Sequence, residues 1–473
     1  MASEVRAGPD HNLLNMKNLT ESVLNRLAKA IMQKHSVDYP AALAILNSFK
    51  LNLVCDDRLT ESSALQAALL TAVNTGKRAF LGGVFVNMPP AIPCLLPWPG
   101  GRTLNQIVQF LGGKSLGRED GPLTQTLFLG GVPDVSEDGL AIVCSGWRGG
   151  IIPVGVSCSL SSSHDFALGG ILAGALGVAR GFLRVSGLSS RPIEEPQGFS
   201  LWRPDLHWLS SEADGPELEL LPKRLWMLGL GHLGQAYLWS FGLLPYAAPG
   251  DALFLLQDFD SAIRGNYTSG LLCEEHNLDK HKTRICAEWL EERGFRTTIT
   301  ERAFDSFTKR TGEEPFVACC GFDAAEPRRI LAGAGFDLIV ECALGAETSR
   351  FDRAIIHTFP DASRKPEEIW ASAREEAVDP NIVRAFNRDG DCGIIAETLA
   401  RKAVSSSFVG AFAGAFVCAE ILRALHGGVR CELVQVQLRH SAPPGVIVKP
   451  ENYSNRVARS GYTAARLVQR MAA

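Results

Sequence analysis

Short apolar runs and a helical pattern follow one another between residues 224 and 256. Residues 224–228 and 253–256 are apolar runs of strand length, and a glycine-rich turn with a helical pattern at 235–246 lies between them. A continuous apolar run bounded by turn residues is typical of a buried strand. The order strand, turn, helix, strand therefore predicts a βαβ unit in a parallel sheet.

The turn between these elements has the spacing GxGxxG, with glycines at Gly229, Gly231 and Gly234. Glycines let the backbone approach a phosphate, and the N-terminus of the following helix offers free N–H groups and a positive dipole end. Asp258 follows the second strand, where a carboxylate can hold ribose hydroxyls. A plain tight turn is the alternative, but the strand before, the helix after and the acid together favour nucleotide binding.

Three further polar residues favour adenylation of a carboxylate. Asn266 and Lys282 follow Asp258, and Asp323 comes after a later apolar run, 316–322. A lysine is a compact charge for triphosphate oxygens. An asparagine can orient phosphate or ribose, and an aspartate can hold Mg²⁺. Each residue also has a plain structural alternative: a solvated lysine, a turn asparagine and a helix N-cap. A nucleotide-dependent dehydrogenase is a less favoured alternative, because its chemistry would give no role to Asn266, Lys282 or Asp323.

The ordered set resembles the ubiquitin-activating enzymes and their ThiF/MoeB-type bacterial relatives, over residues 223–438. The matching positions are Gly229, Gly231, Gly234, Asp258, Asp260, Asn266, Lys282, Asp323 and Arg328, followed by Cys392 and the segment 408–414. The resemblance implies that Asp258 binds the ATP ribose and that Asn266 and Lys282 bind the phosphates. It also implies that Asp323 holds magnesium, that Asp260 and Arg328 belong to the nucleotide site, and that Cys392 forms a thioester.

The chain departs from the pattern of this family at two points. Many members carry an arginine where this chain has Ser269, so Arg264 or an arginine from the other half of the molecule would have to replace it. Members with a structural zinc use paired CxxC motifs, and none of the 12 cysteines here forms one. We therefore predict no zinc.

Cys392 lies in the most polar context among the cysteines of the second half. Asp389 and Asp391 would raise the pKa of its thiol, whereas Arg388 would offset them. The alternative nucleophiles are worse candidates because they lie inside apolar runs. They are Cys319, Cys320, Cys342 and Cys418. A surface cysteine without a role is the other interpretation of Cys392.

A repeated pattern suggests that the chain arose by duplication. Three serines at 161–163 precede a Gly/Ala-rich segment at 170–179, and three serines at 405–407 precede a similar segment at 410–419. A chance match between two Ala/Gly-rich helices is the alternative. The segments are too short to span a bilayer comfortably and are expected to be buried core helices. We expect strands at 51–57, 78–86, 127–129 and 140–144 and a helix at 63–74 in the first half, which has no GxGxxG turn.

These observations predict an α/β protein with two Rossmann-like, ThiF-type adenylation lobes in tandem. The first lobe, 1–190, would be degenerate and the second, 223–440, nucleotide-binding. A linker would cover 191–222, a crossover segment with the catalytic cysteine about 345–404, and a tail 441–473. The length of 473 residues agrees with two large lobes.

Composition narrows the partners of the protein. A net charge of −4 gives no electrostatic footprint for nucleic acid or an anionic membrane. The N-terminus lacks an apolar signal core, and scattered cysteines fit a reducing cytoplasm.

The function expected from the resemblance is ATP- and Mg²⁺-dependent adenylation of the C-terminus of a ubiquitin-like protein. The acyl group would then pass to Cys392 as a thioester and on to a separate conjugating enzyme. The layout resembles the activating enzymes of bacterial ubiquitin-like conjugation operons, some of which serve in phage defence. The alternatives are a ThiF/MoeB-like adenylyltransferase for sulfur transfer and an inactive nucleotide-binding scaffold. The sequence leaves open whether the chain forms a homodimer.

Overall fold

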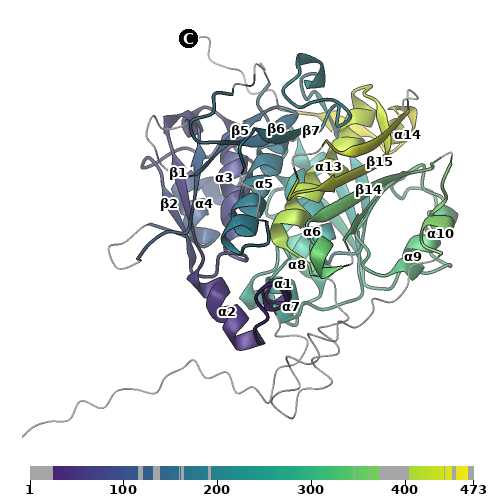
Figure 1. Cartoon of the computed structure of the whole chain (residues 1–473). Helices are drawn as coiled ribbons and strands as arrows, with labels where there is room; N and C mark the ends of the chain where they lie inside the picture. The colour runs from purple at the N-terminus through teal and green to yellow at the C-terminus, as the bar shows by residue number, and fades with distance from the viewer. Residues whose placement is uncertain are drawn as a thin grey trace, which may run out of the picture.

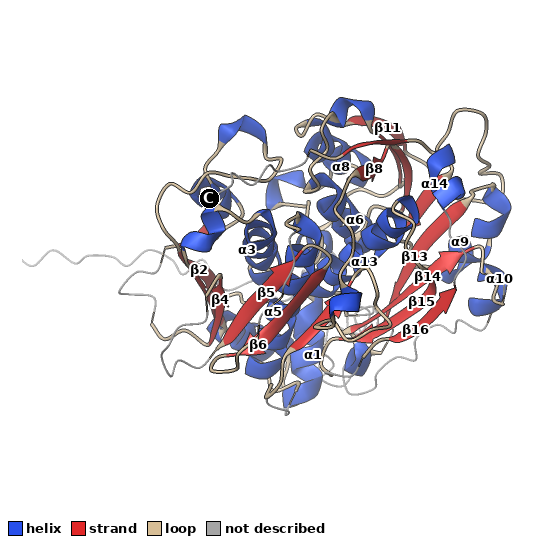
Figure 2. Cartoon of the chain, turned by 90° about the horizontal axis from the view of Figure 1, so that it is seen from above, coloured by secondary structure: helices blue, strands red, loops and turns tan. Residues whose placement is uncertain are grey.

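The computed structural model places two mixed β-sheets on either side of a layer of helices (Figure 1). It describes residues 25–115, 121–131, 139–158, 160, 164–189, 193–345, 347–361, 363–371, 404–440, 443–449 and 454–466. Seen from above, the strands of both sheets flank the central helices (Figure 2).

The first sheet has seven strands and is built from the first half of the chain. Across the sheet they are β3 (Gly113–Lys114), β2 (Gly83–Asn87), β1 (Lys50–Cys55), β4 (Gln125–Leu129), β5 (Leu140–Ser145), β6 (Arg148–Pro153) and β7 (Gln197–Ser200). The strands from β3 to β5 pair in parallel, and β6 and β7 are antiparallel additions.

The second sheet has eight strands in a corresponding order. They are β11 (Arg296–Thr300), β10 (Leu253–Gln257), β9 (Arg224–Leu228), β12 (Val317–Cys320), β13 (Leu338–Leu344), β14 (Arg353–Phe359), β15 (Arg430–Gln437) and β16 (Gly445–Lys449). The strands from β11 to β13 pair in parallel, and the remaining three pair antiparallel. The pairing directions therefore match those of the first sheet strand by strand, with β16 as an extra edge strand.

Two pairs of helices occupy corresponding places in the two halves. Their bounds are α1 (Arg26–His35), α2 (Tyr39–Ser48), α3 (Ser63–Gly76), α4 (Leu104–Phe110), α5 (Ala167–Val185), α6 (His232–Gly242), α7 (Arg264–Tyr267), α8 (Lys282–Glu291), α9 (Ala325–Arg329), α10 (Pro366–Ile369), α13 (Ser407–Leu425) and α14 (Ser454–Arg459). Helix α3 follows β1 as α6 follows β9, and α5 precedes β7 as α13 precedes β15.

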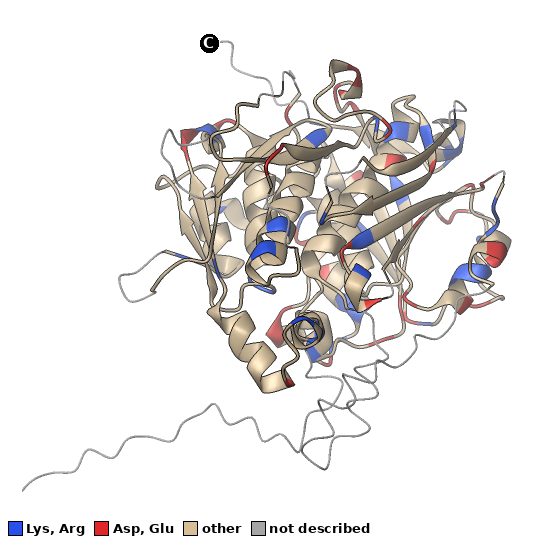
Figure 3. Ribbon diagram, viewed as in Figure 1, with Lys and Arg blue, Asp and Glu red and all other residues tan. Residues whose placement is uncertain are grey.

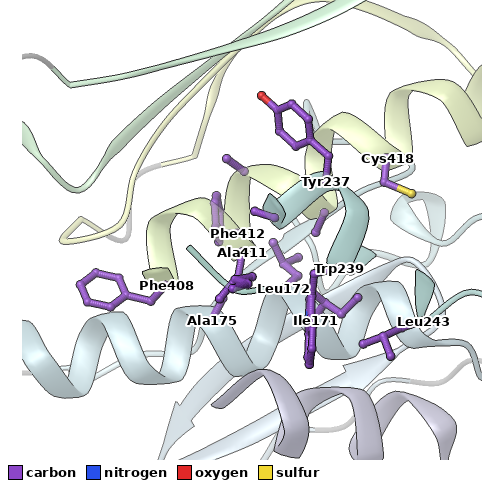
Figure 4. Packing of buried hydrophobic residues seen from close by; sticks show 14 of the residues in the cluster. Ile171, Leu172, Ala175, Tyr237, Trp239, Leu243, Phe408, Ala411, Phe412 and Cys418 are labelled. Atoms are coloured by element: carbon purple, nitrogen blue, oxygen red, sulfur yellow. The ribbon is translucent and has the colours of Figure 1, made fainter. Parts of the chain in front are cut away.

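Helices α5 and α13 form the centre of the protein, as the apolar pattern predicted. Both are long and apolar enough to span a membrane, but 89% of the apolar window of α5 and 94% of that of α13 are buried inside the protein. Helix α13 packs on both α5 and α6, and α5 packs on α3. Figure 4 shows their side chains interdigitating with Trp239 of α6. Burying this much apolar surface is the main favourable term in folding.

Glycines allow the central helices to approach their neighbours closely. A Cβ at Gly174 of α5 would come within 2.4 Å of the carbonyl oxygen of Ala68 in α3, and a Cβ at Gly414 of α13 within 2.6 Å of the carbonyl oxygen of Ala236 in α6. The two helices therefore make the same kind of close backbone contact at matching positions. Charged residues of both signs are scattered over the ribbon (Figure 3).

The structure differs from the sequence expectations at several boundaries. The expected linker, 191–222, contains β7, which completes the first sheet, and β8 (Leu220–Pro222). The expected tail contains β16 and β17 (Tyr462–Ala464), and β17 pairs with β8. All four strands are short or lie at a sheet edge, and β16 and β17 are also partly exposed, so none carries a strong apolar pattern of its own. The expected strand at 78–86 begins only at Gly83, because residues 77–82 form turns after α3.

Candidate functional site

The glycine turn joins β9 to α6 at the carboxyl edge of the second sheet. Gly229 has φ +78°, which side chains other than glycine rarely adopt. Gly234 lies so close to the Gly229 carbonyl that a Cβ would overlap its oxygen, whereas a Cβ at Gly231, the N-cap of α6, would meet no atom within 4 Å. The first and third glycines therefore shape the turn, and the second faces open space at the N-terminus of the helix.

Asp258, Asp260 and Lys282 lie together beside this turn. The backbone N–H of Leu230 donates to Asp258 Oδ2 (2.6 Å), and the N–H of Asp260 donates to Asp258 Oδ1 (2.8 Å). Lys282 begins α8, is 8% exposed, and places its Nζ 2.6 Å from Asp260 Oδ2. The structure thus brings an acid and a buried cation, both predicted from sequence, to the mouth of the glycine turn.

Asn266 caps the short helix α7 next to these residues. Its Oδ1 accepts from the N–H of Ile263 (2.9 Å), and its Nδ2 has no hydrogen-bond partner among the residues that the structure describes. Ser269, in the position where an arginine was expected, is buried and donates to the carbonyl oxygen of Gly265 (3.3 Å). Arg264 is exposed and pairs with Glu275 at 3.4 Å.

Asp323 lies just after β12 and next to the glycine turn. The preceding Gly321 and Phe322 pack against Gly229. Asp323 is exposed and does not cap α9, whose N-cap is Ala324. The alternative role as an N-cap is therefore wrong, and its carboxylate has no hydrogen-bond partner within the described ranges.

Arg328 is buried, and its donors are occupied by groups of the protein. Its Nε donates to the Phe322 carbonyl (3.0 Å), Nη1 lies 3.1 Å from Glu341 Oε1, and the guanidinium stacks over the Trp370 ring at 4.5 Å. Glu341 also bonds His357 Nδ1 at 2.8 Å. The arginine therefore braces the turn that carries Asp323, and its direct role in nucleotide binding stays a prediction.

An arginine that the sequence did not single out extends from the first half of the chain to the segment just ahead of α13. Arg26 opens α1, and its Nη1 donates to Ser405 Oγ (3.3 Å), just ahead of α13. Burial lowers the pKa of His232 to about 4, and the positive charge of Arg26 adds to this effect. Arg26 therefore lies within electrostatic reach of the first residue of α6. No sequence motif marked it, because the residues it approaches are more than two hundred positions away.

Cys392 and much of the expected crossover segment lie outside the described residues. Burial raises the pKa of every other cysteine of the chain above its ordinary value, to about 11 for Cys273 and about 12 for Cys320. A thiol with such a pKa supplies little thiolate at neutral pH. In the ranges that the structure describes, no group of three or more His, Cys, Asp or Glu residues could hold a metal ion.

Two mixed sheets, with a GxGxxG turn after the first strand of the second, define an α/β fold of Rossmann-like character. Models of the BilD N-terminal domain and the BilD C-terminal domain match residues 50–201 and 221–428. A bacterial E1-like protein BilD from Collimonas sp. (strain OK412) is 37% identical over 427 residues, which cover 88% of this chain and 91% of that protein. The chain belongs to the BilD family of bacterial E1-like proteins.

Solved structures of E. coli MccB also match part of the chain. One is 13% identical and covers 48% of this chain and 62% of MccB, with a TM-score of 0.33. Another, of MccB with ATP, is 13% identical and covers 48% of this chain and 63% of that one, with a TM-score of 0.31. The matched region thus spans somewhat less than two thirds of MccB.

Proposed function

We propose that this chain is an ATP-dependent activating enzyme that adenylates the C-terminal carboxylate of a ubiquitin-like protein. The observation that carries the proposal is the open space at Gly231, at the N-terminus of α6, with Lys282 and Asp258 beside it. A helix N-terminus with free N–H groups and a nearby cation favours phosphate. Membership of a bacterial E1-like family supports the same reaction class.

Each site residue would bind a different part of a nucleoside triphosphate. Asp258 accepts ribose hydroxyls through lone pairs that its two backbone partners leave available. Lys282 shifts from Asp260 towards the phosphates, and Asn266 donates its Nδ2–H. Asp323, whose exposed carboxylate has no hydrogen-bond partner among the described residues, would hold a magnesium ion, because Mg²⁺ is usually bound through one or two carboxylates. That ion would neutralise phosphate charge.

The reaction consists of two group transfers. A carboxylate oxygen of the partner attacks the α-phosphorus of ATP, the bond between the α-phosphorus and the bridging oxygen breaks, and pyrophosphate leaves. The thiolate of Cys392 then attacks the acyl carbon of the adenylate, and AMP leaves. The raised pKa values of the other cysteines support Cys392 as the nucleophile. A separate conjugating enzyme would accept the acyl group.

Arg26 is the residue that we propose in place of the arginine missing at Ser269. It comes from the first lobe, donates to Ser405 just ahead of α13, and acts electrostatically on His232 at the start of α6, where charge on the β- and γ-phosphates would need a cation. A fixed guanidinium stabilises charge that develops during phosphoryl chemistry. This arrangement makes the N-terminal helix part of the active site of the second lobe.

The first lobe is proposed to bind no nucleotide, because its corresponding helix end already holds a carboxylate. Asp165 accepts from the N–H of Ser63 (2.6 Å) and of Ala64 (3.2 Å) at the start of α3, and from Ser62 Oγ (2.7 Å). These are the groups that a phosphate would need. The matching strand order of the two sheets supports an origin by duplication, with the first copy degenerate.

Exchange of labelled pyrophosphate into ATP tests the proposed adenylation. The probe is a bacterial ubiquitin-like protein with a free C-terminus, added with MgATP. Asp323→Ala and Lys282→Ala should each reduce exchange at least hundredfold, since both residues act on phosphate charge. Asp323 is exposed, so its variant should leave thermal unfolding nearly unchanged, whereas Lys282→Ala also removes a buried side chain and its ion pair with Asp260 and should lower the unfolding temperature. Full exchange in both variants would remove the assignment of this site.

A further inference from the structure

Side chains at the C-terminal end of α3, in the first lobe, donate hydrogen bonds to the backbone of the second lobe beside the nucleotide site. Arg78 is 2% exposed and donates from Nε to the Tyr267 carbonyl (2.9 Å) and from Nη2 to the Cys273 carbonyl (3.0 Å). These two carbonyls bracket residues 267–273, which we call the bracketed segment. It follows Asn266 directly along the chain and contains Ser269.

Neighbouring residues of the same helix end make further hydrogen bonds and ion pairs to this part of the second lobe. Asn74 donates from Nδ2 to the Leu271 carbonyl (3.1 Å), and its side-chain oxygen accepts from Arg78. Lys77 Nζ lies 2.8 Å from Glu274 Oε1, which is also 3.3 Å from Arg78 Nη2. Three side chains from one helix end therefore fix the bracketed segment and the residue after it.

The bracketed segment is joined in turn to the glycine turn. Gln235 of α6 is fully buried, accepts from the N–H of Leu272 (3.0 Å) and donates to the Leu230 carbonyl (3.1 Å). A Cβ at Gly270 would overlap Gln235 Oε1, so only glycine fits there. A continuous chain of hydrogen bonds thus runs from Asn74 and Arg78 through the bracketed segment and Gln235 to the glycine turn.

We propose that Arg78 is a positioning residue that holds Asn266 and the glycine turn in their phosphate-binding geometry from the first lobe. The planar guanidinium is suited to this task because its donors are arranged in a rigid fork, and Glu274 offsets its charge. Removing it would leave buried carbonyls without a donor, which a folded protein avoids by moving the segment. The first lobe then fixes the geometry of the phosphate site, in addition to packing against the second lobe. The expected effect on ATP binding rests on the proposed function, whereas the positioning of the bracketed segment by Arg78 does not.

Arg180 provides a matched control. It lies on α5 of the same lobe, is 3% exposed, and donates from Nη1 to the Leu438 carbonyl in the second lobe (3.3 Å). Leu438 follows β15, which is separated from β9 by β12, β13 and β14. Arg78→Met and Arg180→Met therefore each remove a buried arginine that bridges the lobes, but only the first touches the site.

Two measurements on the full chain test the proposal. The first is hydrogen–deuterium exchange of peptides covering residues 268–273 without nucleotide. Arg78→Met should accelerate it at least tenfold, Asn74→Ala and Arg78→Lys by less, and Arg180→Met not at all, because exchange reports local opening. The second is the KM for ATP in pyrophosphate exchange, which should rise more than tenfold in Arg78→Met with a smaller change in kcat, and should recover in part in Arg78→Lys.

The outcomes separate the two claims. Unchanged exchange of 268–273 in both Arg78→Met and Asn74→Ala, or an equal change in Arg180→Met, would overturn the positioning role. If Arg78→Met does not fold, Asn74→Ala and Arg78→Lys decide the question by the same criterion. A wild-type protein that fails to bind ATP while Arg78→Met still accelerates hydrogen exchange would reject the proposed function and retain the positioning role.

Discussion

Alanine at Gly231 should separate phosphate binding from folding. The Cβ would meet no protein atom within 4 Å, so the free energy of unfolding should change by no more than about 0.5 kcal/mol, as for an unencumbered surface position. If a phosphate occupies that space, the methyl group competes with it, and overpacking of this kind costs roughly 1–3 kcal/mol. At 1.4 kcal/mol per tenfold, the Kd for ATP should rise about 5- to 150-fold.

Gly234→Ala is the comparison for this prediction. Its Cβ would come within 2.0 Å of the Gly229 carbonyl oxygen, so the backbone itself must move. This variant should lose stability by roughly 1–3 kcal/mol as well as ATP affinity. Thermal unfolding without nucleotide and isothermal titration with ATP measure the two quantities. Gly231→Ala with wild-type ATP affinity would refute the placement of phosphate at the start of α6.

Three further predictions concern residues around the site. Arg26→Ala should slow pyrophosphate exchange about 10- to 150-fold, which corresponds to the loss of a charge-assisted hydrogen bond worth roughly 1.5–3 kcal/mol. Arg26→Lys should retain part of the rate. Equal rates in the wild type and both variants would exclude Arg26 from a role in adenylation. Because the pKa of His232 is lower in the folded than in the unfolded chain, its contribution to stability is present above pH 6.5 and lost as the pH falls towards 4, by roughly 3 kcal/mol. Denaturant melts of wild type and His232→Asn across this range should show a flatter pH dependence in the variant, and parallel curves would contradict the assignment. Calorimetric titration should count one ATP per chain, since Asp165 fills the helix end of the first lobe; a count of two would show that this lobe binds nucleotide.

The sequence predicted the parts of the fold that carry a strong local pattern. The strand at 224–228, the central helices α5 and α13 and the glycine turn are marked by apolar runs or by fixed spacing. Strands β14, β15 and β16 were not expected. Inside the sheet, β14 and β15 carry buried polar residues such as His357 and Glu432 that interrupt their apolar pattern, and β16 is a partly exposed edge strand defined mainly by its partner. Helices α1 and α2 were missed as well.

The candidate site shows the same division. Asp258, Lys282 and Asp323 could be predicted because each follows a strand or begins a helix at a position that parallel-sheet topology brings to one edge. Arg26 and Arg78 could not, because their roles depend on contacts between the lobes. Arg328 was grouped with the nucleotide residues by its spacing from Asp323, yet the structure shows it bound to Glu341 and Phe322.

Activation of a ubiquitin-like protein through an adenylate and then a thioester can be observed directly. The full chain is incubated with MgATP and a bacterial ubiquitin-like protein with a free C-terminus, and the products are analysed by intact mass spectrometry and non-reducing gels. We expect a reducible adduct in the wild type, none in Cys392→Ala, and neither adduct nor acyl-adenylate in Asp323→Ala. An adduct that persists in Cys392→Ala, or no acyl-adenylate with the wild type, would contradict this mechanism.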